Sequence, residues 1–196
     1  MSYIIVGLGN PGNEYEETRH NVGRMMLFMV QKQHGFAEWS TNKKTKSLES
    51  NGFFKKEKAV LVMPETFMNN SGKAVVFYAK SKKAIEKVIV VYDDLDLPLG
   101  KFKISFGRGS GGHRGLDSII KHLKTKDFVR VRVGISPTTP SQKLKKPSGE
   151  KAVLDFILGR FKKNEIDILK KESKKIVEAI ESICVSGREK AMGEFN

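Results

Sequence analysis

Two of the four histidines in this chain stand where an imidazole could do acid–base chemistry. His20 follows a glycine-rich turn in a polar stretch with no apolar face around it. His113 lies in the glycine cluster GRGSGGHRG, where backbone N–H groups can approach a substrate closely. His34 and His122 fall in helical patterns, which is typical of surface or hydrogen-bonded core residues. His20 and His113 are therefore the candidates for a reacting or ligand-binding side chain.

Polar side chains that could assist such a base recur directly after apolar, strand-like runs. Asn10 follows the first run, Asn69 the second and Asp93 the third. Open α/β sheets bind ligands at the carboxyl ends of their strands, so we expect these residues to meet. We expect His20 to deprotonate water, with Asp93 fixing its tautomer and stabilising the imidazolium. Asn10 and Asn69 would hold the water and polarise a carbonyl. Asp93 also fits a turn or a helix cap, and this interpretation stays open.

The glycines near the N-terminus raise a competing interpretation. Gly7, Gly9 and Gly12 fit the dinucleotide pattern G-x-G-x-x-G. However, the acidic stretch NEYEETR follows them, and Lys32 and Gln33 occupy the place of the expected ribose-binding acid. The residues therefore argue against a nucleotide cofactor.

Metal-dependent and covalent chemistries are also disfavoured. The two loop histidines and an aspartate could hold a metal ion, but no H-x-x-H or similar spacing supports such a site. No serine or cysteine stands in a nucleophile-elbow context. We therefore expect no metal and no cofactor.

Composition indicates the kind of partner. Lys and Arg number 36 against 22 Asp and Glu, a net charge of +14 over 196 residues. Such an excess favours nucleic acid first and an acidic membrane surface second, although a solvated lysine-rich surface would give the same count. Cys184 is the single cysteine, so we expect a buried small hydrophobe and no disulfide. No stretch reaches the length of a membrane span and no signal peptide is recognised, so we expect a cytoplasmic protein.

Helix-like and strand-like segments alternate along the chain. Strands are expected over residues 3–8, 59–63, 88–92, 101–106 and 129–135, and helices over 21–34, 72–81, 116–123, 153–158 and 165–184. This alternation predicts a single layered α/β domain with a twisted mixed, mostly parallel sheet flanked by helices. Residues 137–151 are expected to form a flexible loop, either passive or beside a site, and residues 187–196 a frayed tail.

In these motifs the chain resembles the bacterial peptidyl-tRNA hydrolases. The matching blocks are VGLGNPG with TRHN, then PETFMNNSG, VYDDLDLPLG, GSGGHRGLDSI, VRVRVGI and DFILGRF. The resemblance implies one phosphorylase/hydrolase-like domain over residues 1–196 that acts as a monomer without a cofactor. It also implies hydrolysis of the ester that joins a peptide to the 3′ ribose of tRNA, which frees both for reuse.

The resemblance implies roles for individual residues. His20 is similar to the family's catalytic base and Asp93 to its partner. Five residues match positions that contact the substrate, with His113 near the scissile bond: Asn10, Tyr15, Met68, Asn69 and His113. Lys103 and Arg132 match basic positions that hold the tRNA phosphate, a contact that positions RNA without reading its bases.

Three positions depart from the family's usual pattern. Arg114 stands where the family usually has Asn, so a long cation replaces a compact amide. We count Arg114 among the substrate-binding residues, where it could pair with Asp96 or contact the acceptor phosphate. Ser105 replaces a common second basic residue, for which Arg108 could compensate, and Met63 replaces a common Lys.

A non-catalytic RNA-binding module is the alternative function. It explains the basic charge but leaves His20, Asp93 and the two asparagines without a role. The chain also lacks the aromatic-studded strands on which RNA modules stack bases. Ester hydrolysis explains more of the sequence.

Overall fold

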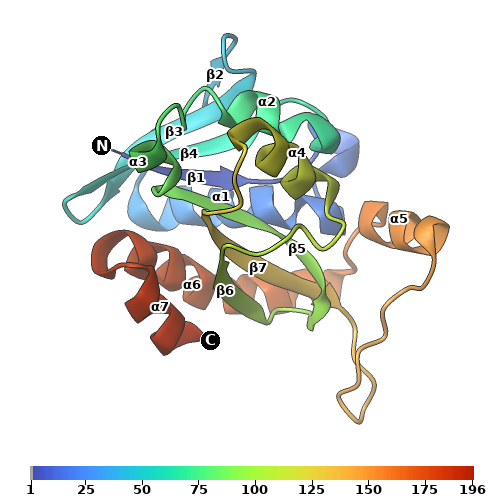
Figure 1. The fold of residues 1–196 in the computed structure, drawn as a ribbon. Helices are drawn as coiled ribbons and strands as arrows, with labels where there is room; N and C mark the ends of the chain where they lie inside the picture. Colours follow the sequence, from blue (N-terminus) through green and yellow to red (C-terminus); the bar gives the residue numbers. More distant parts are fainter. Residues whose placement is uncertain (1) are drawn as a thin grey trace.

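Seven strands form one mixed sheet in the order β2-β3-β4-β1-β5-β7-β6 (Figure 1). The structure is a computed structural model that describes residues 2–196. The strands are β1 (Tyr3–Gly7), β2 (Ser40–Asn42), β3 (Ser47–Phe54), β4 (Glu57–Pro64), β5 (Val88–Pro98), β6 (Phe102–Phe106) and β7 (Val129–Ser136). The expected layered α/β architecture with a mixed sheet is confirmed. The four central strands are parallel, and the strands at both margins pair antiparallel.

Helices cover both faces of the sheet (Figure 1). They are α1 (Val22–His34), α2 (Ser71–Val75), α3 (Lys82–Ile85), α4 (Arg114–Leu123), α5 (Glu150–Leu158), α6 (Lys163–Ser186) and α7 (Arg188–Phe195). Three short 3-10 turns precede or join them: η1 (Asn13–Tyr15), η2 (Arg19–Asn21) and η3 (Met68–Asn70). Neighbouring side chains of β1 alternate between two cores, with Ile5 facing α1, α6 and α7 and Val6 facing α2 and α4. No helix in residues 2–196 combines the length and the hydropathy that crossing a bilayer requires.

The approach of α1 to the sheet sets the position of the segment that precedes it. Gly23, in the first turn of α1, lies so close to β5 that an added Cβ would be 2.3 Å from the Val91 carbonyl oxygen. The Leu8 N–H donates to that same oxygen at 3.0 Å, and the Arg24 N–H donates to the Leu8 carbonyl at 3.3 Å. These backbone contacts therefore fix the position of η2, which carries His20, next to β5.

The predicted frayed tail at residues 187–196 is wrong. Residues from Arg188 onward form α7, with Ala191 buried against α6. The Asn196 side chain accepts a hydrogen bond from the Ile104 N–H at 2.7 Å and donates one to the Ile104 carbonyl at 3.0 Å. Ile104 lies on the edge strand β6, whose outward backbone groups need partners. The tail therefore protects a sheet edge.

Other boundaries also differ from the expectations. The polar strands β2 and β3 were not predicted. The helix expected over 72–81 is shorter than predicted, because α2 ends at Val75 and α3 begins only at Lys82, with the Ser81 hydroxyl capping it. The loop expected over 137–151 ends earlier, because α5 begins at Glu150. In Figure 1 this loop and α5 lie to one side of the sheet.

The close approach of α1 generates a stability prediction. Gly23→Ala forces a methyl group against the Val91 carbonyl, and we expect it to lower the free energy of unfolding by about 1–3 kcal/mol. Gly193→Ala is the matched control, since Gly193 is helical and an added Cβ there meets nothing within 4 Å. Chemical denaturation of both variants checks the prediction, and equal stabilities would contradict it.

Candidate active site

A cavity of about 700 Å³ opens at the carboxyl ends of the central strands. The residues singled out from the sequence that line it include Asn10, His20, Met68, Asn69, Asp93 and His113. They come from the loop after β1, from η2 and η3, from β5 and from the start of α4. Parallel strands bring these segments to one edge of the sheet although up to 103 positions (113 − 10) separate them in the chain. The prediction that these polar side chains lie together at the carboxyl ends of the strands is confirmed.

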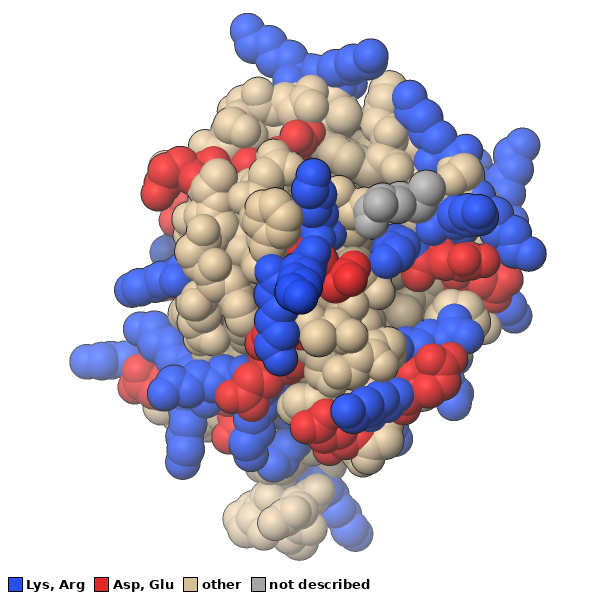
Figure 2. Space-filling view, turned by 90° about the vertical axis from the view of Figure 1, so that its left-hand side faces the viewer, with Lys and Arg blue, Asp and Glu red and all other residues tan. Residues whose placement is uncertain are grey.

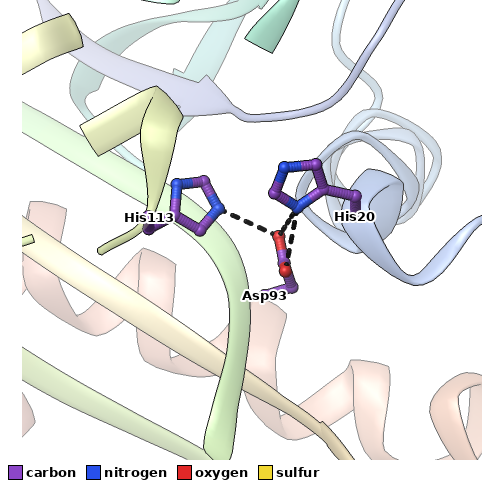
Figure 3. Close-up of side chains that lie close together, drawn as sticks. All are labelled: His20, Asp93 and His113. Carbon is purple, nitrogen blue, oxygen red and sulfur yellow. Dashed lines mark hydrogen bonds and ion pairs between the residues drawn. The ribbon is translucent and has the colours of Figure 1, made fainter. Parts of the chain in front are cut away.

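The centre of the cavity is a buried pair formed by His20 and Asp93 (Figure 3). The His20 Nδ1 atom lies 2.9 Å from Asp93 Oδ1 and 3.0 Å from Oδ2. An ionised carboxylate can only accept hydrogen bonds, so Nδ1 carries the proton. The remaining ring nitrogen, Nε2, then holds a lone pair on the side of the ring away from Asp93 (Figure 3). Such an imidazole is arranged to take a proton from a molecule in the cavity.

The ionised state of Asp93 follows from its partners. Burial by itself raises the pKa of this carboxyl group, but the neighbouring imidazoles of His20 and His113 outweigh burial and hold the pKa well below its usual range. Asp93 is therefore a carboxylate at neutral pH. An anion beside His20 stabilises the positive charge that the imidazole acquires when it takes up a proton.

His113 contacts the same carboxylate from the other side. Its Nε2 lies 3.0 Å from Asp93 Oδ1, and its Nδ1 accepts a hydrogen bond from the Leu116 N–H at 3.3 Å. The ring is packed between His20 and Tyr92, each with its ring centroid 4.9 Å away. Both ring nitrogens therefore have protein partners, which leaves neither of them for the substrate contact that the resemblance implies.

Asn10 is held in place by three hydrogen bonds. Its N–H donates to Asn21 Oδ1 at 2.8 Å, and Asn21 Nδ2 donates to its carbonyl oxygen at 2.9 Å. Its own Oδ1 accepts from the Met68 N–H at 2.8 Å. The amide is thus fixed with Nδ2 as the group available to a ligand. Asn21 was missed as a site residue, although it stands beside His20 in the quoted TRHN block.

An apolar wall completes the cavity opposite the polar groups. Met68 is buried, whereas Phe67 of the segment before η3 is 60% exposed. Leu154 and Leu158 of α5 also line the cavity and keep more than a third of their surface exposed. Sequence reasoning missed this contribution of α5. The signal was an apolar helix face over 153–158 with no assigned partner in the core.

Of the two basic residues predicted to hold the tRNA phosphate, Arg132 lines the cavity and Lys103 does not. Lys103 of β6 is exposed and directly opposite Arg132 of β7 in the antiparallel register. The Arg132 Nε donates to Asp94 Oδ2 at 2.6 Å, so this cation is already paired. Tyr15 lies in η1, half-buried, and is not among the residues that line the cavity. Buried Arg130, not predicted, donates to the Gly109 carbonyl at 2.6 Å and holds the glycine cluster.

Arg114 and Ser105, two of the three departures from the family pattern, line the cavity, whereas Met63 is buried in β4 outside it. Arg114 pairs with Glu150 at the start of α5, with 3.1 Å between Nη2 and Oε1, and both side chains are exposed. The suggested pairing of Arg114 with Asp96 is wrong, because Asp96 binds Lys146 at 2.6 Å. These two ion pairs connect the segment around residues 146–150 to both sides of the cavity mouth.

Arg19 of η2 connects the segment that carries His20 to the far end of α5. Its guanidinium donates to the Gly159 and Arg160 carbonyls at 3.2 and 3.0 Å and to Glu165 at 2.9 Å. It also lies 4.4 Å from the centre of the Phe156 ring. The residue directly before His20 therefore anchors the junction between α5 and α6.

One set of side chains in residues 2–196 has the composition of a metal site. The ligand atoms of His20, Asp93 and His113 lie within 4.8 Å of one another. Two imidazoles and a carboxylate suit zinc or another transition metal. In the geometry described above, however, both imidazoles use their facing nitrogens to donate hydrogen bonds to Asp93.

Comparisons with known proteins agree with this geometry. The family model described as peptidyl-tRNA hydrolase matches residues 4–196. Peptidyl-tRNA hydrolases of Thermoanaerobacter sp. (strain X514) and Carboxydothermus hydrogenoformans are 44% and 41% identical to this chain, which covers at least 98% of each. A crystal structure of peptidyl-tRNA hydrolase from Acinetobacter baumannii superposes with a TM-score of 0.87 at 29% identity, over 100% of this chain and 94% of that one. The chain belongs to the peptidyl-tRNA hydrolase family.

Proposed function

We propose that this protein hydrolyses the ester bond between a peptide, or an N-blocked amino acid, and the 3′ ribose of tRNA. The observation that carries the proposal is the buried His20–Asp93 pair, which leaves His20 Nε2 free at the cavity that Asn10 also lines. The family match and the relatives' names support this choice of substrate. A non-catalytic RNA-binding module would have no use for an ionised, buried carboxylate next to an accessible base.

The mechanism follows from the positions of the protons. His20 Nε2 removes a proton from water, and the resulting hydroxide attacks the ester carbonyl carbon. The Asp93 carboxylate stabilises the imidazolium through Nδ1–H. The Asn10 Nδ2–H, fixed by the backbone of Met68, is the donor for the oxyanion, and Asn69 positions substrate and water at the rim. The ester C–O bond then breaks, and the imidazolium returns its proton to the ribose 3′ oxygen.

The substrate's two parts meet different walls of the cavity. The peptide lies against the apolar wall of Met68, Phe67 and the exposed leucines of α5. The tRNA phosphate lies at the rim with Lys103 and Arg132, and Arg114 adds a cation there once it leaves Glu150. Phosphate contacts of this kind allow many tRNAs to be bound.

On one face of the molecule the positive charge is dispersed among acidic side chains. Lysine and arginine side chains alternate with acidic ones on the face where β1 begins (Figure 2). A dispersed charge raises the rate of encounter with a polyanion without fixing where it binds. We propose that the protein acts in the cytoplasm as a monomer, so that a single cavity and its basic rim bind one acceptor end.

The base can be tested by its removal. His20→Ala is expected to lower kcat by about 10²–10⁴-fold and leave tRNA affinity nearly unchanged, because the proton transfer occurs in the transition state. The measurement is release of N-blocked amino acid from its tRNA, with excess chelator in parallel. His34→Gln, on α1 outside the cavity, is the control. A normal rate in His20→Ala would end the proposal.

The partner of the base can be tested in the same assay. Asp93→Asn keeps the side-chain shape but removes the charge that stabilises the imidazolium, so kcat should fall about 10²-fold or more. Thermal melting should show that the variant is folded. Asp167→Asn, on the exposed face of α6, should match the wild type. Unchanged turnover in Asp93→Asn would mean that the pair is structural.

The basic rim makes a prediction about salt. Lys103→Ala and Arg132→Ala should each weaken tRNA binding and reduce the slope of log affinity against log salt by about 1, because each removes one phosphate contact. Lys83→Ala, on α3 at the other end of the sheet, should change neither as much. Binding isotherms over a salt series check this. An unchanged slope would place the phosphate contact elsewhere.

A further inference from the structure

A single carboxylate oxygen in this site accepts hydrogen bonds from two imidazoles (Figure 3). Asp93 Oδ1 lies 2.9 Å from His20 Nδ1 and 3.0 Å from His113 Nε2. Both rings are almost completely enclosed, and their centroids are 4.9 Å apart. Two imidazolium ions at this distance would repel each other strongly in a site of low dielectric constant. One of the two histidines must therefore stay neutral when the other takes a proton.

Contacts with helix α4 make the surroundings of the His113 ring different from those of the His20 ring. His113 is the N-cap residue of α4, and its Nδ1 accepts the Leu116 N–H at 3.3 Å. A proton on Nδ1 would replace this hydrogen bond by two N–H groups facing each other. It would also place a positive charge at the positive end of the helix dipole. His20 Nε2, by contrast, has no hydrogen-bond partner within residues 2–196.

We propose that the N-terminus of α4 keeps His113 neutral, with its proton on Nε2, so that His20 alone carries the proton of the reaction. The hydrogen bond from His113 holds the Asp93 carboxylate in position and limits how strongly that carboxylate stabilises the His20 imidazolium. His113 is then a positioning residue that acts through Asp93. The inference rests on the proposed function in that it takes His20 as the base.

The surrounding charged groups do not change which of the two histidines takes the proton. Burial raises the pKa of Tyr92, which packs on the His113 ring, to about 12, so its hydroxyl group stays neutral. The other charged groups that line the cavity are Arg108, Arg130, Asp96 with its partner Lys146, and the ion pairs Asp94–Arg132 and Arg114–Glu150. None of them contacts Asp93 in the described structure. They stay the same in the variants proposed below.

Two substitutions separate the roles of the two ring nitrogens of His113. His113→Asn retains an oxygen that can cap α4 in place of Nδ1, but its side chain is too short to donate to Asp93. His113→Gln is longer and places an N–H donor where Nε2 lies. The comparison therefore isolates the hydrogen bond to the carboxylate from the helix cap.

The pH dependence of kcat/KM should distinguish the variants. Without the second donor, the Asp93 carboxylate stabilises the His20 imidazolium more strongly, so His20 stays protonated to higher pH. The acid limb of the His113→Asn profile should move upward by about 0.5 pH unit or more. In His113→Gln the limb should stay close to that of the wild type. Thermal melting checks that both variants are folded.

Nuclear magnetic resonance of ¹⁵N-labelled histidine tests the proton positions without any substrate. We expect His113 to show Nε2–H with a bare Nδ1 throughout the pH range in which His20 becomes an imidazolium. Protonation of His113 before His20, or an acid limb that does not move in His113→Asn, would overturn the inference while ester hydrolysis by the wild type stands. Absence of hydrolysis by the wild type would instead overturn the proposed function, and the resonance titration would still decide where the protons lie.

Discussion

A carboxylate that is almost fully removed from water constrains the whole arrangement around the cavity. Burying a charge without partners costs far more than a typical side-chain contact contributes, so Asp93 requires donors on both sides. η2 supplies one donor and the cap of α4 supplies the other, from opposite faces of the sheet. Each of these segments is in turn fixed by close backbone contacts, η2 where Gly23 of α1 meets β5 and α4 where its Ser118 carbonyl meets Gly72 of α2. The need to satisfy the buried Asp93 charge thus connects the helical layers on the two faces of the sheet.

The sequence was most informative where strand ends carry polar residues. Asn10, Asn69 and Asp93 could be placed at a common edge because parallel strands impose that geometry whatever the helices do. The five strand-like runs were recognised because their apolar side chains are buried, either on both faces of the sheet or against a neighbouring element. β3 was missed because its sequence SLESNGFF is largely polar and only some of its residues are buried, a pattern that single-chain periodicity does not separate from a loop.

Other features depended on contacts between distant segments. The partner of Arg114 could not be inferred, since exposed cations pair with whichever carboxylate the loops bring near, here Glu150 and not Asp96. The hydrogen bond by which His113 caps α4 could not be predicted either, because a helix cap and a site residue have the same sequence pattern in a glycine-rich loop. α7 was missed because its stability comes from the edge strand that it covers, and residues 188–195 alone carry a weak apolar pattern. In each case tertiary packing decided between local alternatives.

The contacts at the two ends of α5 differ in strength. The end near Gly159 is held by a buried guanidinium with two carbonyl groups and a carboxylate, whereas the end near Glu150 is held by a solvent-exposed ion pair, a kind of contact that contributes little to stability. Any displacement of α5 is consequently a rotation about the Gly159 end, with an amplitude that grows toward Glu150. Leu158, near the pivot, is displaced least, while Leu154 and Glu150 travel farther. The diameter of the cavity mouth can therefore vary while Leu158, at the inner end of α5, keeps its position in the cavity lining.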